Sequence, residues 1–535
     1  MANTLKFGAG QWATKEGSTL AYNDENDNYK PLPFDFTRAS NATVVNKAGL
    51  IETVGNGIPR IDFLGNTQGA LKLEPQRTNL ITQSEAFPNS YWTKGGASIQ
   101  GDPSTAGSEL IVNGDFATDS DWIKGTGWSI SGGSLNGSST TTSVTQLNTG
   151  LVAGKMYQVV YTISNYVSGS VRIELGSANV SVGTTRSANG TYTEYIEALG
   201  DEQLIFDGIS AFTGSIDNVS VKEVQGFTSP DGTTNAFKLV ESSVNEIHSL
   251  VRTFSSTSGN SYSFKIYVKY NGRRHFALRE SGSTGYYVVF DLLEGTIISS
   301  SNATGTIKPM EDGWFEVTHT SVAGVSFNIG YFLLSDSYVS GNVAPYQGDG
   351  TSGVYIYGAQ LEEGSYATSY IPTQGSAVTR LADSCSQTPP DGVIGQTEGT
   401  MFLDFKPQTL DATSRFLSIE NSSSVSNGWM GIFSALVSGD IRFRFYGDGW
   451  DFNSTLIIEK DTRYKIAVSY KNGVQTSAYV NGNLIGNLTA SLSGKSFQKI
   501  RLSEATIGVR GDADFNDIKL YNTRLSNSEL QALTS

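Results

Sequence analysis

The sequence predicts an all-β protein built from tandem β-sandwiches, one of them inserted into another. Its composition is rich in turn-forming and aromatic residues: 59 Gly, 25 Tyr and 26 Phe among 535 residues, with only 16% charged. This mixture suits short strands joined by tight turns. Many stretches also alternate apolar and polar side chains with the period of two that a half-buried strand requires. The third observation is a nested order of opening and closing segments.

Two opening segments precede two closing segments along the chain. The openings are NLI at 79–81 and LIVNGDF at 110–116, and aromatic residues follow each of them. The closings are GSIDNVSV at 214–221 and GVYIYGAQLE at 353–362. The order open, open, close, close predicts that one sandwich interrupts the other, since lengthening an exposed loop costs little closure entropy.

The chain is too long for one core, and roughly 100–200 residues per domain predicts three or four domains. Residues 1–78 look too small and polar for a core of their own. They are interpreted either as a segment that docks on a partner or neighbouring subunit, or as a small β-domain packed on the next one. The predicted organisation is an N-terminal attachment segment at 1–78, an interrupted sandwich at 79–106 and 226–375, an inserted sandwich at 107–225, a Ser/Pro/Gly-rich linker at 376–397, and a last β-domain at 398–535.

Alternating segments predict the individual strands. They lie at 156–163, 170–175, 192–198 and 202–206 in the insert, at 261–269, 286–291 and 314–318 in the interrupted sandwich, and at 400–405, 441–445 and 464–470 in the last domain. Asn472-Gly473 and Asn481-Gly482 predict hairpin turns. One short helix is expected at the C-terminus, with Ser526 as its N-cap and Glu529 at the third helical position.

Charge and cysteine content exclude several classes of partner. The formal net charge is −14, which argues against nonspecific binding to nucleic acid or to anionic membranes. Cys385 is the single cysteine, so no intrachain disulfide is expected. The N-terminus shows no signal peptide, and no stretch approaches the ~20 apolar residues of a membrane span. We therefore expect a protein made in a cytoplasm that acts outside only after lysis or on a particle, without membrane insertion.

No catalytic constellation is predicted. A glycanase needs two carboxylates that flank the scissile bond. Glu420, Glu459 and Glu504 are isolated, and each is interpreted as a solvated surface carboxylate. His248, His275 and His319 lie in strand-like stretches without a nucleophile elbow or clustered metal ligands. The sequence predicts that the protein is not an enzyme.

Aromatic side chains are the candidate glycan-binding groups, because flat apolar rings stack on sugars. Trp450, Tyr446 and Trp429 are the candidates. Trp450 lies in a turn-like stretch, where an exposed ring and a core ring are equally expected. Trp122 and Trp314 are expected in the core, which is the usual place of tryptophan in a sandwich.

The insert resembles the jelly-roll carbohydrate-binding modules of many glycanases. NGDF at 113–116, the tryptophans after it and IDNV at 216–219 carry this resemblance. In that family a structural calcium ion often lies near the opening acidic residue and the closing aspartate. The resemblance implies Asp115 and Asp217 as its ligands, although Ala117 stands where many members have Glu. No other cofactor is expected.

The last domain resembles the laminin-G/concanavalin-like sandwich. YKIAV at 464–468, AYVNGNLIG at 478–486 and FNDIKLYNTRLS at 515–526 carry the resemblance, which implies a fold and no particular ligand. Asp512 and Asp514, near Asp517, form either a second calcium site or a solvated loop.

Three further strings resemble tail-fibre and head-fibre proteins of tailed bacteriophages that infect Bacteroidetes and related bacteria. They are FTRASNAT at 36–43, GALKLEPQRTNL at 69–80 and GAQLEEGSYATSYIPT at 358–373. The resemblance implies a virion appendage, with other virion proteins as partners. Fibres are commonly trimeric, so a homo-oligomer is expected.

Three functions are therefore considered. The first is a non-enzymatic phage fibre or decoration protein, located in the virion, which attaches through its N-terminus and displays sandwiches that bind host-surface glycans. The second is a secreted carbohydrate-binding accessory protein, against which the missing signal peptide counts. The third is a polysaccharide depolymerase, against which the missing carboxylate pair counts. The first is the prediction.

Overall fold

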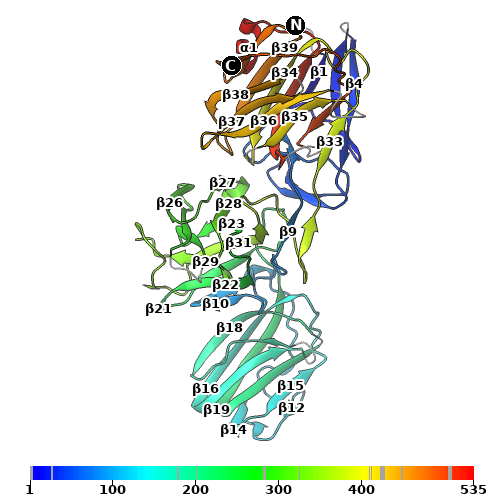
Figure 1. Ribbon diagram of the computed structural model, residues 1–535. Coiled ribbons are helices and arrows are strands. Elements are labelled where there is room, and N and C mark those ends of the chain that lie inside the picture. The colour runs from blue at the N-terminus through cyan, green and yellow to red at the C-terminus, as the bar shows by residue number, and fades with distance from the viewer. Residues whose placement is uncertain are drawn as a thin grey trace. The chain divides into compact units, whose positions relative to one another are not determined.

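A computed structural model confirms the predicted all-β fold class. Its regular secondary structure is almost entirely β-strand, with one short α-helix, α1 (Asn527–Thr534), among the residues described. The structure describes residues 4–25, 28–176, 180–200, 202–280, 285–324, 326–408, 410, 413–421, 428–447, 450–503 and 509–535. The chain divides into two compact units (Figure 1). Unit 1 comprises 1–79, 366–371 and 378–535, and unit 2 comprises 80–365 and 372–377.

Unit 1 takes strands from both ends of the chain. Its N-terminal strands are β1 (Leu5–Gly8), β2 (Thr14–Lys15), β3 (Ser18–Glu25), β4 (Asn28–Thr37), β5 (Ala42–Val45), β6 (Ile51–Val54), β7 (Ile61–Asp62), β8 (Ala70–Leu73) and β9 (Arg77–Asn79). Its C-terminal strands are β32 (Val378–Arg380), β33 (Ser384–Gln387), β34 (Glu398–Pro407), β35 (Ser414–Glu420), β36 (Trp429–Val437), β37 (Asp440–Gly447), β38 (Trp450–Ile457), β39 (Tyr464–Lys471), β40 (Gln475–Val480), β41 (Asn483–Thr489), β42 (Lys499–Leu502), β43 (Val509–Arg510) and β44 (Ala513–Tyr521).

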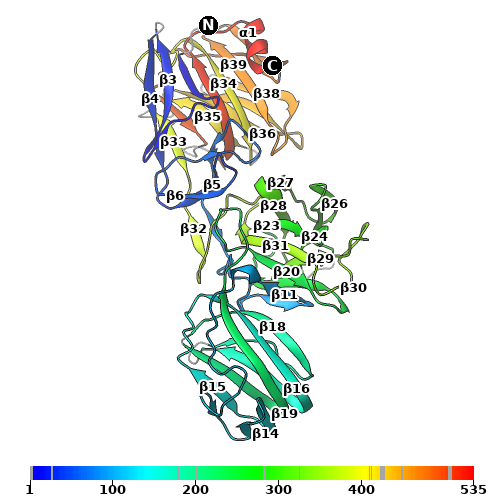
Figure 2. The ribbon, with the colours of Figure 1, turned by 180° about the vertical axis from the view of Figure 1, so that it is seen from behind.

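Most of these strands join one hydrogen-bonded sheet of 18 strands around a large shared core. Strand β1 pairs along its length with β44, and Leu5 lies opposite Leu520. Strand β33 pairs on one side with β4 (Figure 2) and on the other with β42. The first and last segments of the sequence are therefore neighbouring strands of one sandwich.

The predicted attachment segment at 1–78 is accordingly wrong as a separate domain. Its alternating apolar residues point into the same core as the C-terminal strands. Phe7 and Phe34 have ring centroids 4.7 Å apart, and both are buried with Phe405 and Phe515. The period of two at Leu32, Phe34 and Phe36 is visible in the sequence, but β33, one of the strands that pair with β4, lies more than 300 residues away.

The predicted linker at 376–397 is also wrong. Strand β32 pairs with β9, and β33 is an internal strand of the large sheet. Cys385, in β33, is fully buried. The Ser/Pro/Gly-rich composition hides these strands because they are only a few residues long, and they gain their stability from pairing with strands that are distant in sequence.

The interrupted sandwich of unit 2 consists of two six-stranded sheets. One has the order β10 (Thr93–Gly95), β22 (His248–Ser255), β29 (Ser326–Leu334), β24 (His275–Glu280), β25 (Tyr287–Asp291), β26 (Thr296–Ser301). The other has the order β11 (Ala97–Gln100), β20 (Phe237–Glu241), β31 (Gly353–Glu363), β23 (Ser261–Asn271), β28 (Trp314–Val322), β27 (Ile307–Pro309). The pair β21 (Asn245–Glu246) and β30 (Tyr346–Gln347) lies apart from both sheets.

The inserted residues interrupt this sandwich between β11 and β20. These two strands pair directly, with Ile99 opposite Leu239. Ile81 and Ile356 lie in the same core, and the backbone NH of Leu80 donates to the carbonyl of Leu361 at 2.8 Å. This is the nested arrangement that the order of openings and closings predicts, although 80–81 is not itself a strand.

The insert has its own sandwich and core. Its strands are β12 (Ile123–Lys124), β13 (Trp128–Ile130), β14 (Leu135–Thr140), β15 (Ser143–Leu147), β16 (Met156–Leu175), β17 (Ser181–Val182), β18 (Gly190–Glu197) and β19 (Gln203–Val224). The segments 156–163 and 170–175, predicted as separate strands, are one long strand. Register shifts in its pairing with β19 mark bulges, which let the two long strands bend without ending.

The predicted helix is confirmed. Ser526 caps α1 through a reciprocal capping box: its hydroxyl accepts from the backbone NH of Glu529, and the Glu529 carboxylate accepts from the backbone NH of Ser526 at 2.7 Å. Leu530 is buried against Phe402 and Ala467, so the helix packs on unit 1.

Candidate functional site

The best candidate site lies on the outer face of strands β35 to β38 in unit 1. Residues directly opposite each other on antiparallel strands project from the same face. Glu420 lies opposite Trp429, Phe433 opposite Arg444, and Tyr446 opposite Asp451. The alternate residues, such as Met430 and Phe445, point into the core. The sheet therefore presents aromatic and charged side chains together, and we call this surface the aromatic face.

Three aromatic rings form the centre of this face. The rings of Trp429 and Tyr446 lie 5.1 Å apart at 77°, and those of Trp429 and Phe433 lie 5.5 Å apart at 76°. Phe433 is buried, whereas Trp429 and Tyr446 are half-buried. Edge-to-face packing fixes the orientation of both half-buried rings. The structure thus brings together two of the three glycan-binding candidates.

Arginine and aspartate side chains flank the rings. The Arg444 guanidinium lies 3.9 Å from the centroid of Tyr446 and donates from Nε and Nη2 to the two carboxylate oxygens of Asp451, each at 2.9 Å. This pairing raises the pKa of Arg444. The side chains are 26% and 55% exposed. Residue type alone does not single out this pair, although the alternation that places Tyr446 outward also places Arg444 outward.

A second arginine lies beneath the rings. Arg415 is fully buried, and its guanidinium is 5.3 Å from the centroids of both Trp429 and Phe433. Glu420, which was interpreted as a solvated carboxylate, is buried and forms ion pairs with Arg415 at 3.6 Å and with Arg501. That interpretation is therefore wrong. Isolation in sequence does not imply solvation, because strand pairing brings the arginines to Glu420.

Among the described residues, accessible cationic side chains outnumber accessible acidic ones on this face. Strand alternation and register place Arg442, Arg444, Lys499 and Arg501 on it against Asp440 and Asp451, while Arg415 and Glu420 are buried and paired with each other. The whole chain carries a net charge of −14, so this local excess opposes the general charge of the protein. Such an arrangement attracts anionic groups to one surface.

The remaining predicted site residues are placed differently. Trp450 begins β38 and pairs with Gly447, but its side chain lies outside the described residues, as does Glu504. Asp115 accepts from the backbone NH of Ala117 at 3.3 Å, and Asp217 accepts from that of Asn218 at 2.6 Å.

The backbone brings the two candidate calcium ligands toward the same end of the insert. The NH of Val219 donates to the carbonyl of Gly114 at 2.8 Å, which joins the opening and closing segments. In the described part of the chain, no group of three or more His, Cys, Asp or Glu residues has a geometry that could hold a metal ion. Calcium at Asp115 and Asp217 stays a prediction.

The acidic cluster of Asp512, Asp514 and Asp517 makes ion pairs and hydrogen bonds within the protein. Asp514 pairs with Lys72 at 2.9 Å and Lys406 at 3.4 Å, and Asp512 accepts from the Tyr366 hydroxyl at 3.3 Å. Neither the calcium site nor the solvated loop considered from the sequence describes these carboxylates, which are buried in ion pairs and hydrogen bonds.

Several predicted core residues are confirmed. Trp122 and Trp314 are buried, as expected. His248 and His319 are fully buried, and burial lowers the pKa of His319 to about 3. A neutral, enclosed imidazole of this kind fits a core position.

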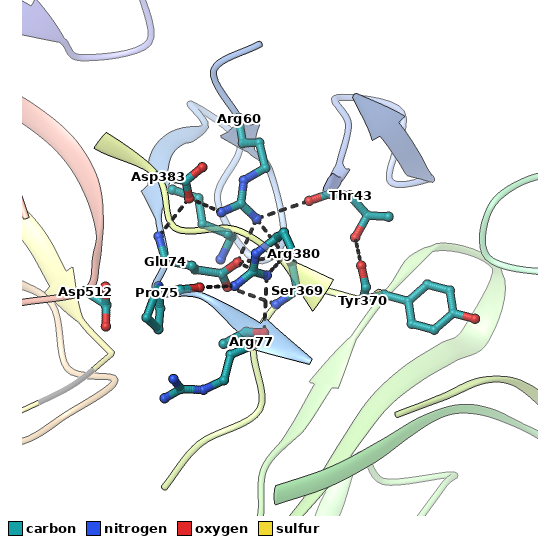
Figure 3. A network of polar contacts seen from close by, with 12 residues as sticks. Thr43, Arg60, Glu74, Pro75, Arg77, Ser369, Tyr370, Arg380, Asp383 and Asp512 are labelled. Atoms are coloured by element: carbon teal, nitrogen blue, oxygen red, sulfur yellow. Dashed lines mark hydrogen bonds and ion pairs between the residues drawn. The ribbon is translucent and has the colours of Figure 1, made fainter. Parts of the chain in front are cut away.

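A network of buried ion pairs lies in unit 1 (Figure 3). The guanidinium of Arg60 bonds Glu74 at 2.7 Å and also Asp383, and that of Arg380 bonds the same oxygen of Glu74 at 2.7 Å. Ser369 donates to Glu74 at 2.7 Å. These ionic side chains are at most 3% exposed, so the network is sealed from any substrate.

The network fixes three distant segments to one another. Arg38 joins it through Asp383 at 3.1 Å, and the Thr43 hydroxyl donates to the carbonyl of Tyr370 at 2.5 Å. Burial alone would raise the pKa of Glu74, but the charges of Arg380 and Arg60 hold it well below its usual value. Its role is structural: it holds the segments that leave unit 1 after Asn79 and return to it.

Comparisons with known proteins give only remote likenesses. No protein-family model matches the chain, and no curated protein matches it in sequence. The CBM40 module of the Ruminococcus gnavus IT-sialidase is 17% identical with a TM-score of 0.22, over 26% of this chain and 84% of that chain. The binding domain of botulinum neurotoxin DC, solved in complex with rat synaptotagmin II, is 12% identical with a TM-score of 0.23, over 29% of this chain and 40% of that chain. These likenesses are too remote to bear on what the chain binds.

The described ranges hold a single α-helix, α1, which is short. Within those ranges, no helix has the length and apolar character needed to cross a bilayer.

Proposed function

We propose that this protein is a non-enzymatic glycan-binding component of a tailed-phage virion appendage, whose aromatic face contacts host-surface glycans. The observation that carries the binding role is the pair of half-buried rings, Trp429 and Tyr446, beside the exposed Arg444–Asp451 pair. A ring supplies an apolar surface for stacking, while a guanidinium and a carboxylate bond sugar hydroxyls in fixed directions.

The charge of the face supports a preference among glycans. Cations exceed carboxylates there in a chain that is otherwise acidic. Opposite charges across an interface accelerate encounter and select partners. The proposed ligand is therefore a surface glycan that carries carboxylate or sulfate groups.

The virion location rests on the strings at 36–43, 69–80 and 358–373. These strings build the junction where the chain leaves unit 1 and returns to it, and unit 1 contains both ends of the sequence. Attachment does not require a separate N-terminal arm, because residues 1–78 belong to unit 1. Assembly into homo-oligomers remains part of it.

Binding of the purified full-length protein to surface polysaccharide extracted from host cells tests the proposal. Trp429→Ala removes one stacking ring, which is worth on the order of 1–3 kcal/mol and predicts a ten- to a hundred-fold weaker affinity. Tyr446→Phe keeps the ring and serves as the matched control, with a change below about threefold expected. Equal binding by wild type and Trp429→Ala would reject the site, and shortening of the polysaccharide would reject the non-enzymatic role.

The virion location is tested separately. Particles purified from an infected culture that encodes the protein should contain it at a constant copy number, as measured by mass spectrometry. Its recovery only in the soluble fraction would favour a secreted binding protein.

A further inference from the structure

A groove in unit 2 lies between the inserted and the interrupted sandwich. Its volume is 390 Å³, and its walls are β10 and β11 on one side and β18 on the other. A second cavity of 470 Å³ shares Pro88 and Glu197 with it. Ligand pockets have volumes of roughly 300–1,000 Å³ and occur preferentially between domains. Size and position therefore suit a small ligand.

A lysine and a glutamate line this groove without pairing. The ammonium of Lys94 donates to the carbonyls of Pro88 at 2.7 Å and Asn89 at 2.8 Å. An ammonium has three donors, so one remains. The carboxylate of Glu197 accepts only a long bond of 3.4 Å from Asn89 among the described residues. No ion pair within 4.0 Å joins Lys94 to Glu197 in the described part of the chain, although each lies within electrostatic range of the other.

The charges of Lys94 and Glu197 are only partly compensated by each other and by nearby hydrogen bonds, as their pKa values show. Burial lowers the pKa of Lys94 to about 8, against the opposing charge of Glu197. Burial likewise raises the pKa of Glu197, against the hydrogen bond from Asn89 and the charge of Lys94. Both side chains are half-buried. A half-buried charge without a full set of protein hydrogen bonds can accept a ligand that completes the set.

The neighbouring wall is rigid and already satisfied. Glu194 accepts from the Tyr161 hydroxyl at 2.8 Å and from the NH of Thr184 at 2.6 Å, and it pairs with Arg186 at 3.4 Å. The half-buried ring of Tyr195 also lines the groove, and its hydroxyl accepts from Gln158 at 2.9 Å. These bonds satisfy Glu194, whereas Lys94, Glu197 and the half-buried Arg186, whose contacts with Glu194 are long, retain bonding capacity toward the groove.

We propose that this groove is a second binding site, for a neutral oligosaccharide, in which neighbouring hydroxyls of one sugar bridge Lys94 and Glu197. A hydroxyl both donates and accepts, so a vicinal diol donates a hydrogen bond to the carboxylate and accepts one from the ammonium. An anionic ligand is repelled by Glu197 and a cationic ligand by Lys94. The ring of Tyr195 provides an apolar contact for a sugar face. This site is distinct from the aromatic face of unit 1.

Protection of Lys94 from acetylation tests the site in the full-length protein. The protein is treated with the N-hydroxysuccinimide ester of acetic acid, with or without maltotriose, cellotriose, mannotriose or tri-N-acetylchitotriose, and each lysine is followed by mass spectrometry. At least one trisaccharide should slow acetylation of Lys94 severalfold. The exposed Lys471, which pairs with Glu398, is the internal control and should not change.

Two variants show whether protection of Lys94 arises from binding in this groove. Glu197→Gln keeps the shape of the side chain and should abolish protection, with unchanged near-ultraviolet circular dichroism. Trp429→Ala should keep it, because its ring lies in unit 1. The proposal is overturned if no trisaccharide protects wild-type Lys94, if Glu197→Gln remains protected, if Trp429→Ala loses protection, or if only trigalacturonic acid protects. The first arm needs no variant, so a folding defect in Glu197→Gln leaves the test intact.

Discussion

At the scale of single residues, Glu74 shows how segments that are distant in sequence are held together by a buried charge. Arg38 and Thr43 come from the string at 36–43, Glu74 from that at 69–80, and Ser369 from that at 358–373. All of them meet in the buried network. Residues from all three strings therefore hold together the place where the chain leaves unit 1 and returns to it.

Replacing Glu74 by Gln should destabilise unit 1 by about 3–5 kcal/mol, because Arg60 and Arg380 lose the charge that compensates their burial. Hydrogen exchange of β9 and β32, which the network holds, measures the effect. Glu223→Gln is the control: this carboxylate belongs to an exposed surface pair with Lys155, and a change within about 0.5 kcal/mol is expected. Equal effects of the two substitutions would show that the network contributes nothing.

The same carboxylate predicts the response to acid. The pKa of Glu74 is lower in the folded protein than in the unfolded chain, where it is about 4.3. Its contribution is therefore fully present above that unfolded value and is lost as the pH falls towards the folded one. Stability of unit 1 below pH 5 should fall less steeply in Glu74→Gln than in wild type. Parallel pH profiles would contradict this assignment.

Individual site residues were only partly predictable from the sequence. Trp429 and Tyr446 could be chosen because aromatic rings near turns are candidates by residue type alone. Arg415 and Glu420 could not be placed, since their surroundings depend on the register of β35 against β36 and β42. Lys94 and Glu197 give no local signal, because each becomes notable only when the insert packs on its host.

At the scale of elements, the N-terminal strands are the least expected feature. Local alternation predicts that β4 is a strand, but nothing local predicts that its partner is β33. Pairing between strands so distant in sequence is set by which apolar faces fit together in the core. Strands within hairpins, and the capped helix α1, were predictable because their signals are local.

Phe34 tests whether the N-terminal strands are integral to unit 1. Phe34→Ala should cost about 3–5 kcal/mol, as expected for a large cavity in a closed core. Hydrogen exchange in β34 and β44 should accelerate with it, although both strands lie more than 350 residues further along the chain. Val167→Ala, at a side chain 73% exposed, is the control with almost no expected effect. Unchanged exchange in β34 and β44 after Phe34→Ala would support residues 1–78 as a separate segment.

At the scale of the whole molecule, the chain is nested twice. Unit 2 interrupts unit 1 after Asn79, and the insert interrupts unit 2 after β11. Deletion of residues 107–225 should therefore leave unit 1 folded, whereas deletion of 1–78 should unfold it. Circular dichroism and proteolysis of the two deletion variants provide the comparison, and a folded unit 1 without residues 1–78 would contradict the nesting.

Net charge also acts at this scale. The chain carries a net charge of −14, whereas the local cation excess of the aromatic face favours an acidic glycan. Added salt screens such exposed charges over about 10 Å at 0.1 M. Affinity for an acidic host glycan should therefore fall as salt rises, as followed by titration calorimetry. Affinity that rises with salt would show that the overall negative charge dominates.

Binding of host-surface glycan by the aromatic face of unit 1 is tested most directly by a crystal structure of the full-length protein with a fragment of that glycan. We expect a sugar ring stacked on Trp429, with hydroxyl or acidic groups bonded to Arg444 or Asp451. A fragment bound elsewhere in unit 1, with Trp429 and Tyr446 free of ligand, would contradict it.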